Sequence, residues 1–263
     1  MNNLTERRLP DSYAICLIGH GSRDPEGTRE FLTLWKKLAE RNFCRITEYG
    51  FLEFARPSAT EALAACHQKG VENIISLPGI LLPGKHTQND IPEVFGKVFH
   101  NTPEINPLFP RPLGFDSKIM EACQGRIKDA EKLSSNAIPH SKTLLAILAH
   151  GSRDSRINSE AEKKLVLLGK EMGFAKTVVH FAGTSKISME DIFENLRPQD
   201  FSRVILLPFF LFTGVWVKRV HALSDTLQRK HTKTEFLKTS CLQHHDSIVD
   251  ALIQRVAEVA SGQ

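Results

Sequence analysis

Cysteine is scarce in this chain, and its placement excludes several kinds of protein. The 263 residues include five cysteines, and no two of them form a C-x-x-C pair. An odd, scattered set of thiols argues against a disulfide framework, a zinc ribbon and an iron–sulfur cluster. We therefore expect most of these cysteines to be reduced residues of the core.

The sequence also lacks a hydrophobic run long enough to cross a bilayer. Its longest apolar stretch, from Val204 to Val217, is broken by Pro208 and Thr213-Gly214 and is shorter than the ~20 residues a spanning helix needs. The first eight residues are polar and lack the apolar centre of a signal peptide. We expect no membrane span and a cytoplasmic location.

An excess of charge of one sign is missing as well. The formal net charge is +4, and no basic run with interleaved aromatic residues occurs. This pattern argues against a nucleic-acid partner, while the mild positive charge suits an anionic small molecule. With 41% apolar and 24% charged residues and no biased tract, the composition is that of an ordinary soluble globular protein.

The most informative feature that is present is a repeated motif. The stretch His20-Gly21-Ser22-Arg23-Asp24 returns 130 positions later as His150-Gly151-Ser152-Arg153-Asp154. The same offset carries other landmarks of the first half onto the second: Leu77-Pro78 onto Leu207-Pro208, and Gly84 onto Gly214. The chain is therefore a duplicated unit, predicted to form two lobes at residues 1–135 and 136–263, with the polar stretch 134–139 as their linker.

Apolar runs rich in strand formers alternate with stretches of helical periodicity. Strands are expected at residues 13–18, 46–52, 73–77 and 104–109, and again at 143–149, 177–182, 203–207 and 235–242. Helices are expected after Asp24-Pro25, from the capping box Ser58–Glu61, after Asp90-Ile91-Pro92, at 118–133, at 159–172, from Ser188, and at 247–259. The alternation predicts an α/β fold of two similar Rossmann-like lobes, each with a parallel sheet covered on both faces. Ligands of such sheets bind at the carboxyl ends of the strands.

Three residues with metal-binding and acid–base chemistry follow the first three expected strands. His20, Glu53 and His86 are spaced 33 positions apart, one in each loop. Parallel strands bring such loops to one rim of the sheet. Two imidazoles and a carboxylate suit a divalent first-row metal such as cobalt, nickel or iron, and they can accept protons near neutral pH.

The second lobe keeps only one of these three residues. The 130-residue offset places His150, Gly183 and Trp216 opposite His20, Glu53 and His86. We therefore expect one equipped site and one dismantled copy, in which His150 has a structural role or supports residues that contact a ligand.

Several motifs resemble those of a known enzyme family. They are Gly19–Arg23, Phe51–Ser58, and Pro78–His86 followed by Asp90-Ile91-Pro92, with weaker echoes at Pro112–Gly114 and His244–Ile248. Over nearly its whole length the chain resembles the sirohydrochlorin chelatases of the CbiX and SirB type. These are class II chelatases, which insert a metal into a tetrapyrrole without hydrolysing ATP.

The resemblance implies a fold and a set of roles. It implies two α/β lobes facing each other across a cleft, His20 and His86 as metal-binding and proton-accepting histidines, and Glu53 as the active-site carboxylate. It also implies insertion of Co²⁺ into sirohydrochlorin in cobalamin biosynthesis, with Fe²⁺ insertion to give sirohaem, or Ni²⁺ insertion, as alternatives. No cofactor beyond the metal substrate is expected.

Sirohydrochlorin is a polycarboxylate, so cationic side chains near the loops are candidate anchors. In the first lobe these are Arg23, Arg56 and Lys85, and in the second Lys186, Lys218 and Arg219. Trp216 and the group Phe209, Phe210 and Phe212 are candidates for an apolar wall along the ring.

The chain departs from the family in one respect: it lacks the histidine-rich tail and the C-x-x-C segment of some long chelatases.

Other functions fit the motifs less well. A histidine phosphatase needs Arg directly before His-Gly, where Gly19 and Ala149 stand here, and no serine lies in the G-x-S-x-G setting of a lipase-like hydrolase. A non-catalytic protein that binds a metal or tetrapyrrole remains an alternative.

Overall fold

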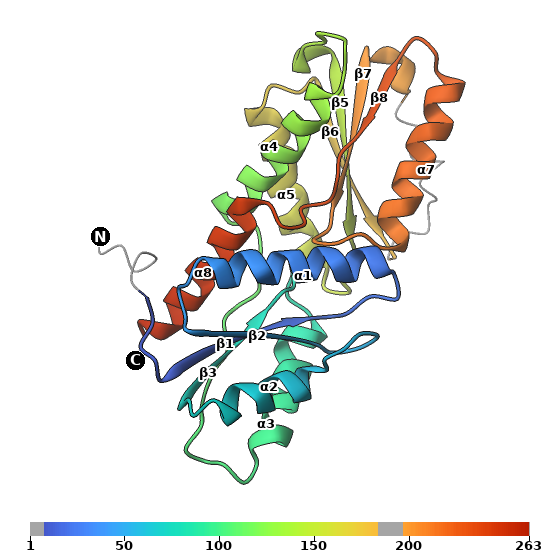
Figure 1. Ribbon diagram of the computed structural model, residues 1–263. Coiled ribbons are helices and arrows are strands. Elements are labelled where there is room, and N and C mark those ends of the chain that lie inside the picture. The colour runs from blue at the N-terminus through green and yellow to red at the C-terminus, as the bar shows by residue number, and fades with distance from the viewer. Residues whose placement is uncertain (1–7, 184–196, 263) are drawn as a thin grey trace. The chain divides into compact units, whose positions relative to one another are not determined.

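The computed structural model describes residues 8–183 and 197–262 and contains two parallel β-sheets (Figure 1). The first sheet has the strand order β2-β1-β3-β4, with β1 at Tyr13–Gly19, β2 at Ile46–Phe51, β3 at Asn73–Pro78 and β4 at Asn106–Leu108. The second has the order β6-β5-β7-β8, with β5 at Thr143–His150, β6 at Lys176–Ala182, β7 at Arg203–Phe209 and β8 at Glu235–Lys238. The predicted duplicated α/β fold is confirmed.

The strand registers repeat as well as the strand order. Gly19 pairs with Phe51 in the first sheet, and Ala149 pairs with Phe181, 130 positions on, in the second. Ile18 pairs with Pro78, and Leu148 with Pro208, at the same offset. The loops that follow the first three strands of each sheet therefore start from equivalent positions.

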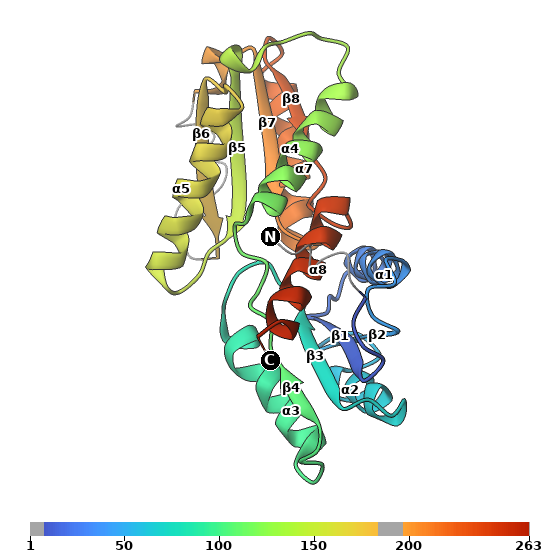
Figure 2. The same cartoon turned by 90° about the vertical axis from the view of Figure 1, so that its left-hand side faces the viewer.

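Helices cover both faces of each sheet. The helices are α1 Pro25–Glu40, α2 Ala59–Gln68, α3 Ile91–Phe99, α4 Ser117–Lys132, α5 Ser155–Glu171, α7 Val215–Lys230 and α8 Asp246–Ala260. Short turns are η2 His86–Asp90, η3 His140–Lys142 and η4 Pro198–Asp200. Figure 1 shows α1 and α8 on one face of the first sheet and α2 and α3 on the other. Figure 2 shows α4 and α5 in front of the second sheet and α7 behind it. No helix among residues 8–183 and 197–262 has the length and apolar character of a membrane span.

The repeated motif ends in a helix cap in both copies. Asp24 accepts the backbone N–H of Glu26 at 3.1 Å and begins α1, and Asp154 accepts that of Arg156 at 2.9 Å and begins α5. Helix α5 therefore starts one turn before the expected position 159, because Asp154 caps it as Asp24 caps α1. Strand β8 is shorter than expected, and α7, which the sequence analysis did not name, follows β7; the helix expected from Ser188 lies outside the described residues.

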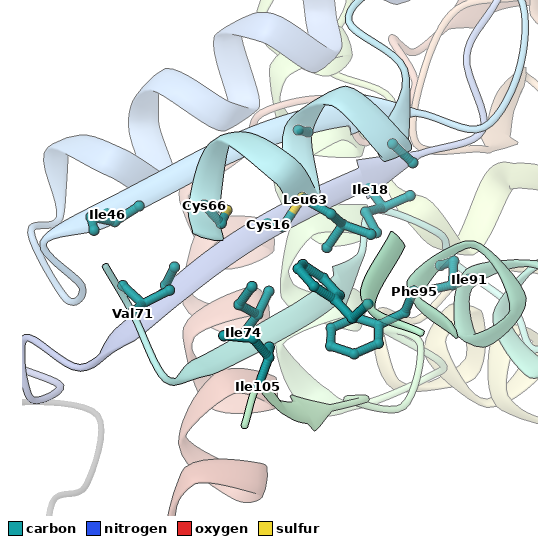
Figure 3. Packing of buried hydrophobic residues seen from close by; sticks show 14 residues of the cluster. Cys16, Ile18, Ile46, Leu63, Cys66, Val71, Ile74, Ile91, Phe95 and Ile105 are labelled. Atoms are coloured by element: carbon teal, nitrogen blue, oxygen red, sulfur yellow. The ribbon is translucent and has the colours of Figure 1, made fainter. Parts of the chain in front are cut away.

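Buried apolar residues hold α2 and α3 against the first sheet. Alternate residues of β1, namely Ala14, Cys16 and Ile18, pack with Leu63 and Cys66 of α2 (Figure 3). Phe95 and Phe99 of α3 complete this cluster, with ring centroids 4.6 Å apart. All five cysteines are free and buried, as expected.

The closing helices do not follow the expected lobe boundary. The chain separates into one unit of residues 1–119 and 244–263 and a second of residues 120–243. Helix α8, at the C-terminal end, thus belongs with the first sheet, and α4 from Met120 onward belongs with the second. The boundary at 135/136 separates the two repeats in the sequence. In the structure, the helix that ends each repeat packs with the sheet of the other repeat.

Buried Arg255 fastens α8 to the first unit. Only 1% exposed, it donates to the backbone oxygens of Pro112 at 3.2 Å and Leu113 at 2.8 Å. It also pairs with Asp116 and, at 2.7 Å, with Glu258. A buried guanidinium is tolerated only when its donors are satisfied, so these partners define where α8 docks.

Candidate active site

His20 lies in the turn directly after β1 and is held by its own backbone. Its Nδ1 lies 3.0 Å from the carbonyl oxygen of Gly21, which can only accept, so Nδ1 carries the proton. The neutral imidazole then has its lone pair on Nε2. The residue is partly buried.

The turns after β1 and β2 are joined to each other. The backbone N–H of Glu53 donates to the carbonyl oxygen of His20 at 2.9 Å, and that of Leu52 donates to Gly19 at 2.9 Å. Gly21 has a φ of +92°, and a Cβ at this position would lie 1.7 Å from the carbonyl oxygen of Glu53. Only glycine allows both this backbone conformation and this approach.

Replacing Gly21 with alanine is therefore expected to separate the two turns. We expect Gly21→Ala to lower the free energy of unfolding by about 2–3 kcal/mol and to impair the site. Gly70→Ala is the matched control. Gly70 has a φ of +73°, but a Cβ added there would lie more than 4 Å from the other described atoms around it. This substitution should lower the free energy of unfolding by about 1 kcal/mol. Urea unfolding of both variants checks this, and equal losses would contradict the close approach as the cause.

His86 begins the π-helical turn η2 in the loop after β3. The turn is started by Gly84, whose backbone N–H donates to the hydroxyl of Thr87 at 3.1 Å. It ends where the N–H of Ile91 donates to the carbonyl oxygen of His86 and α3 continues. The ring centroids of His86 and His20 are 4.6 Å apart at an interplanar angle of 81°. The structure thus brings together the two histidines that lie 66 positions apart in the sequence.

Asp90 orients His86 and was missed by the sequence analysis. Its Oδ2 lies 2.7 Å from Nδ1 of His86. A carboxylate accepts the Nδ1 proton, so the lone pair of His86 is also on Nε2. The sequence predicts a helix start at Asp90. The spacing of four residues between His86 and Asp90 is typical of two side chains that touch on one face of a helix, and it could have indicated this contact.

Glu53 is placed near the histidines by its backbone, while its side chain is exposed. Among the residues that the structure describes, no group of three or more His, Cys, Asp or Glu side chains is positioned to hold a metal ion. The two imidazoles are in ring contact, and the expected role of Glu53 stays a prediction.

The three cationic residues expected to bind carboxylates in the first lobe have different surroundings. Arg56 contacts Glu61 at 2.6 Å, and Lys85 lies 3.7 Å from Asp90. The backbone and hydroxyl of Ser58, together with Arg56, lower the pKa of Glu61 to about 2, so that carboxylate is ionised. Arg23 instead stacks on an aromatic ring, with its Cζ 4.7 Å from the centroid of Phe54.

The second copy keeps the turn but not the other groups. Nδ1 of His150 lies 2.9 Å from the carbonyl oxygen of Gly151, and Nδ1 of His20 lies 3.0 Å from that of Gly21. Gly183, with a φ of +82°, faces the His150 ring. Trp216, in the first turn of α7, packs against the core of the second unit, and Arg219 lies 5.0 Å over its ring.

The remaining residues that the sequence singled out have structural surroundings or lie outside the described residues. Phe209 is 1% exposed and belongs to the core, whereas Phe210 packs against the core cluster from its edge. His245 caps α8 by accepting the N–H of Ser247 at 3.2 Å. Lys186 lies outside the described residues.

Comparison with known proteins identifies relatives along both halves of the chain. The family model described as CbiX matches residues 14–130 and 144–259. A sirohydrochlorin cobaltochelatase of Priestia megaterium is 28% identical over 252 residues, covering 95% of this chain and 81% of the relative. A sirohydrochlorin ferrochelatase of the same organism is 24% identical over 251 residues, covering 95% and 91%. The solved structure of SirB from Bacillus subtilis with Fe³⁺ matches with a TM-score of 0.81 at 23% identity, covering 95% of this chain and 98% of that one; this likeness shows the same fold.

Proposed function

Since the chain belongs to the CbiX family, we propose that it is a chelatase that inserts a divalent metal ion into sirohydrochlorin. The full-length relatives named above are a cobaltochelatase and a ferrochelatase for this macrocycle. The resemblance in the sequence and the match over both halves support the same reaction here.

The pair His20 and His86 is the observation that carries the proposal. With metal–nitrogen bonds of about 2.1 Å, two imidazoles that bind one ion at a right angle have centroids about 4.6 Å apart. The centroids of His20 and His86 are 4.6 Å apart. Both Nδ1 atoms face oxygen acceptors, so both Nε2 atoms offer a lone pair to the incoming metal.

The reaction requires ligand exchange and proton removal. We assign His20 and His86 to holding the metal ion while the four ring nitrogens replace its other ligands. Two pyrrole N–H protons leave as the metal enters; each imidazole can accept one on Nε2 once that nitrogen has released the metal to the ring, and the carboxylate of Glu53 is a further acceptor. The backbone N–H of Glu53 donates to the carbonyl oxygen of His20, so this residue lies beside the histidines.

Substrate carboxylates need cationic partners, for which we propose Arg23, Arg56 and Lys85. Arg56 and Lys85 must exchange Glu61 and Asp90 for a substrate carboxylate. Both side chains are more than three-quarters exposed, so this exchange costs little. We keep Trp216 as a candidate contact with the ring, because an indole offers a large apolar face to a conjugated macrocycle.

We propose Co²⁺ as the physiological metal, with Fe²⁺ and Ni²⁺ as alternatives. The cobaltochelatase has the higher identity, 28% against 24%, and a shell of imidazoles accepts all three ions. The test is the rate of insertion of each ion into sirohydrochlorin by the purified protein without oxygen, followed by absorbance. A faster reaction with Fe²⁺ or Ni²⁺ would reassign the metal.

The same assay separates an enzyme from a binding protein. With sirohydrochlorin and metal in large excess, a chelatase metallates many equivalents per protein molecule. A protein that only binds its ligand stops after about one equivalent. Such a stop with all three metals would contradict the proposed function.

Loss of the Asp90 carboxylate should weaken the site without unfolding it. We expect Asp90→Asn to lower metal affinity or insertion rate about 10- to 100-fold, because the amide no longer fixes the Nδ1 proton of His86. Glu93→Gln is the control: Glu93 lies on α3 and pairs with Lys97 at 2.6 Å on the surface. Titration with Co²⁺ and initial rates check both variants, and equal behaviour would contradict the orienting role.

A further inference from the structure

Phe54 has an unusual conformation for an aromatic residue. Its φ is +63°, and the N–H of Ala55 donates to the carbonyl oxygen of Glu53 at 2.8 Å across it. This is the rarer form of γ-turn, with a positive φ at its centre, and it is strained for a residue with a Cβ. Strain of this kind persists where the surrounding structure holds it and is frequent at ligand-binding sites.

The strained turn presents the Phe54 ring to solvent beside the histidines. Phe54 is 51% exposed, although burial of a large apolar ring is favourable. Its centroid lies 5.8 Å from that of His20, which is in ring contact with His86. An apolar face is therefore held next to the metal-binding pair by a backbone conformation that costs free energy.

Arg23 adds a positive charge at the edge of this ring. Its guanidinium lies over Phe54 at 4.7 Å. Among the described residues Arg23 pairs with no carboxylate, whereas Arg56 and Lys85 each contact one. The contact with the ring holds the guanidinium beside Phe54 without using its N–H donors for another carboxylate, so they can bind one from a ligand.

We propose that Phe54 and Arg23 together recognise the macrocycle, which rests on the proposed function of this site. The ring of Phe54 packs against the conjugated face of the substrate, and Arg23 binds a carboxylate at its periphery. A flat, conjugated polycarboxylate is the chemistry that an exposed aromatic ring with a stacked, uncommitted guanidinium fits. The pair then sets affinity for the macrocycle, while His20 and His86 set affinity for the metal.

Variants that tolerate a positive φ separate the ring from the strain. Phe54→Gly and Phe54→Asn both accept this backbone conformation, and both remove the ring. We expect each to raise the KM for sirohydrochlorin about tenfold, with little change in kcat and unchanged Co²⁺ affinity without the macrocycle. Phe54→Tyr should restore the KM. The control is Phe109→Ala: Phe109 is 40% exposed in the same unit but contacts Phe95, so its KM should stay that of the wild type.

Salt dependence tests the contribution of Arg23. The KM of the wild type should rise with ionic strength, because salt screens the ion pair with the substrate carboxylate. Arg23→Gln should raise the KM at low salt and flatten this dependence. If the wild type turns over sirohydrochlorin and the folded Gly or Asn variant keeps its KM, the inference is overturned and the chelatase proposal stands. If the wild type inserts none of the three metals, the chelatase proposal fails first.

Discussion

Replacing His86 with alanine is expected to lower the rate of metal insertion between about a hundredfold and ten-thousandfold, whereas replacing His150 with alanine should leave most of it. His86 lies in ring contact with His20 and is oriented by Asp90. His150 occupies the same turn as His20, but Gly183 and Trp216 stand where the first copy has Glu53 and His86. The duplication thus provides a matched control within one chain.

Three measurements check this difference. Initial rates with sirohydrochlorin and Co²⁺ report on the reaction, Co²⁺ titration reports on the metal ligands, and thermal unfolding shows that both variants are folded. His20→Ala should behave as His86→Ala does. A larger loss of rate in His150→Ala than in His86→Ala would place the working site in the second copy and overturn the assignment.

Replacing Arg255 with methionine is expected to destabilise the first unit by about 2–3 kcal/mol, because the carbonyl oxygen of buried Leu113 and the partly buried carboxylates of Asp116 and Glu258 lose a charged donor. Arg255 is 1% exposed and binds Asp116, Glu258 and two backbone carbonyl oxygens. Arg111→Met is the matched control, since Arg111 contacts the same two carboxylates with a side chain that is 55% exposed. It should cost no more than about 1 kcal/mol. Denaturant unfolding at neutral pH compares the two variants, and equal losses would contradict burial as the reason.

The pH dependence of this difference has a definite sign. Burial alone would raise the pKa of Asp116, but its bonds to Arg255 and Arg111 outweigh burial and lower the pKa in the folded protein. Its stabilising contribution is therefore present above the pKa of the unfolded chain, about 3.9, and is lost as the pH falls through the lower folded value. We expect the stability gap between the wild type and Arg255→Met to narrow on acidification from pH 7 to pH 3. A gap that widens would contradict the ion pair as its source.

Local sequence patterns were sufficient to predict most of the fold. The capping box at Ser58 and Glu61 begins α2 as expected, because its hydrogen bonds form within four residues. The repeat predicts two sheets of the same strand order, and both sheets have it. The exchange of α4 and α8 between the two sheets was not predictable from local patterns, because the apolar face of a helix does not specify which sheet it packs against. Three partners of Arg255 on α8 lie more than 130 residues away along the chain, at Pro112, Leu113 and Asp116.

The proximity of His20 and His86 was predictable from the parallel strands. His20 and His86 follow adjacent strands, β1 and β3, and the carboxyl ends of such strands lie at one edge of the sheet. Asp90 and Phe54 were missed because their roles depend on a π-helical turn and a positive φ. Neither conformation has a distinctive residue pattern, and an aromatic residue is not expected at a positive φ.

The exchange of the closing helices has a consequence for how the chain folds as it is synthesised. Residues 120–243 form one continuous unit, so every part of it emerges from the ribosome before α8 does. The first unit, although its sheet is translated first, lacks the helix that contacts α1 and β3 until residues 246–260 emerge. Domains generally fold in the order in which they are translated. Here the unit whose sheet is translated first is completed second. The half that carries His20 and His86 is the last to be completed, so translation stopped before α8 would release a chain whose histidines lie in an unfinished unit.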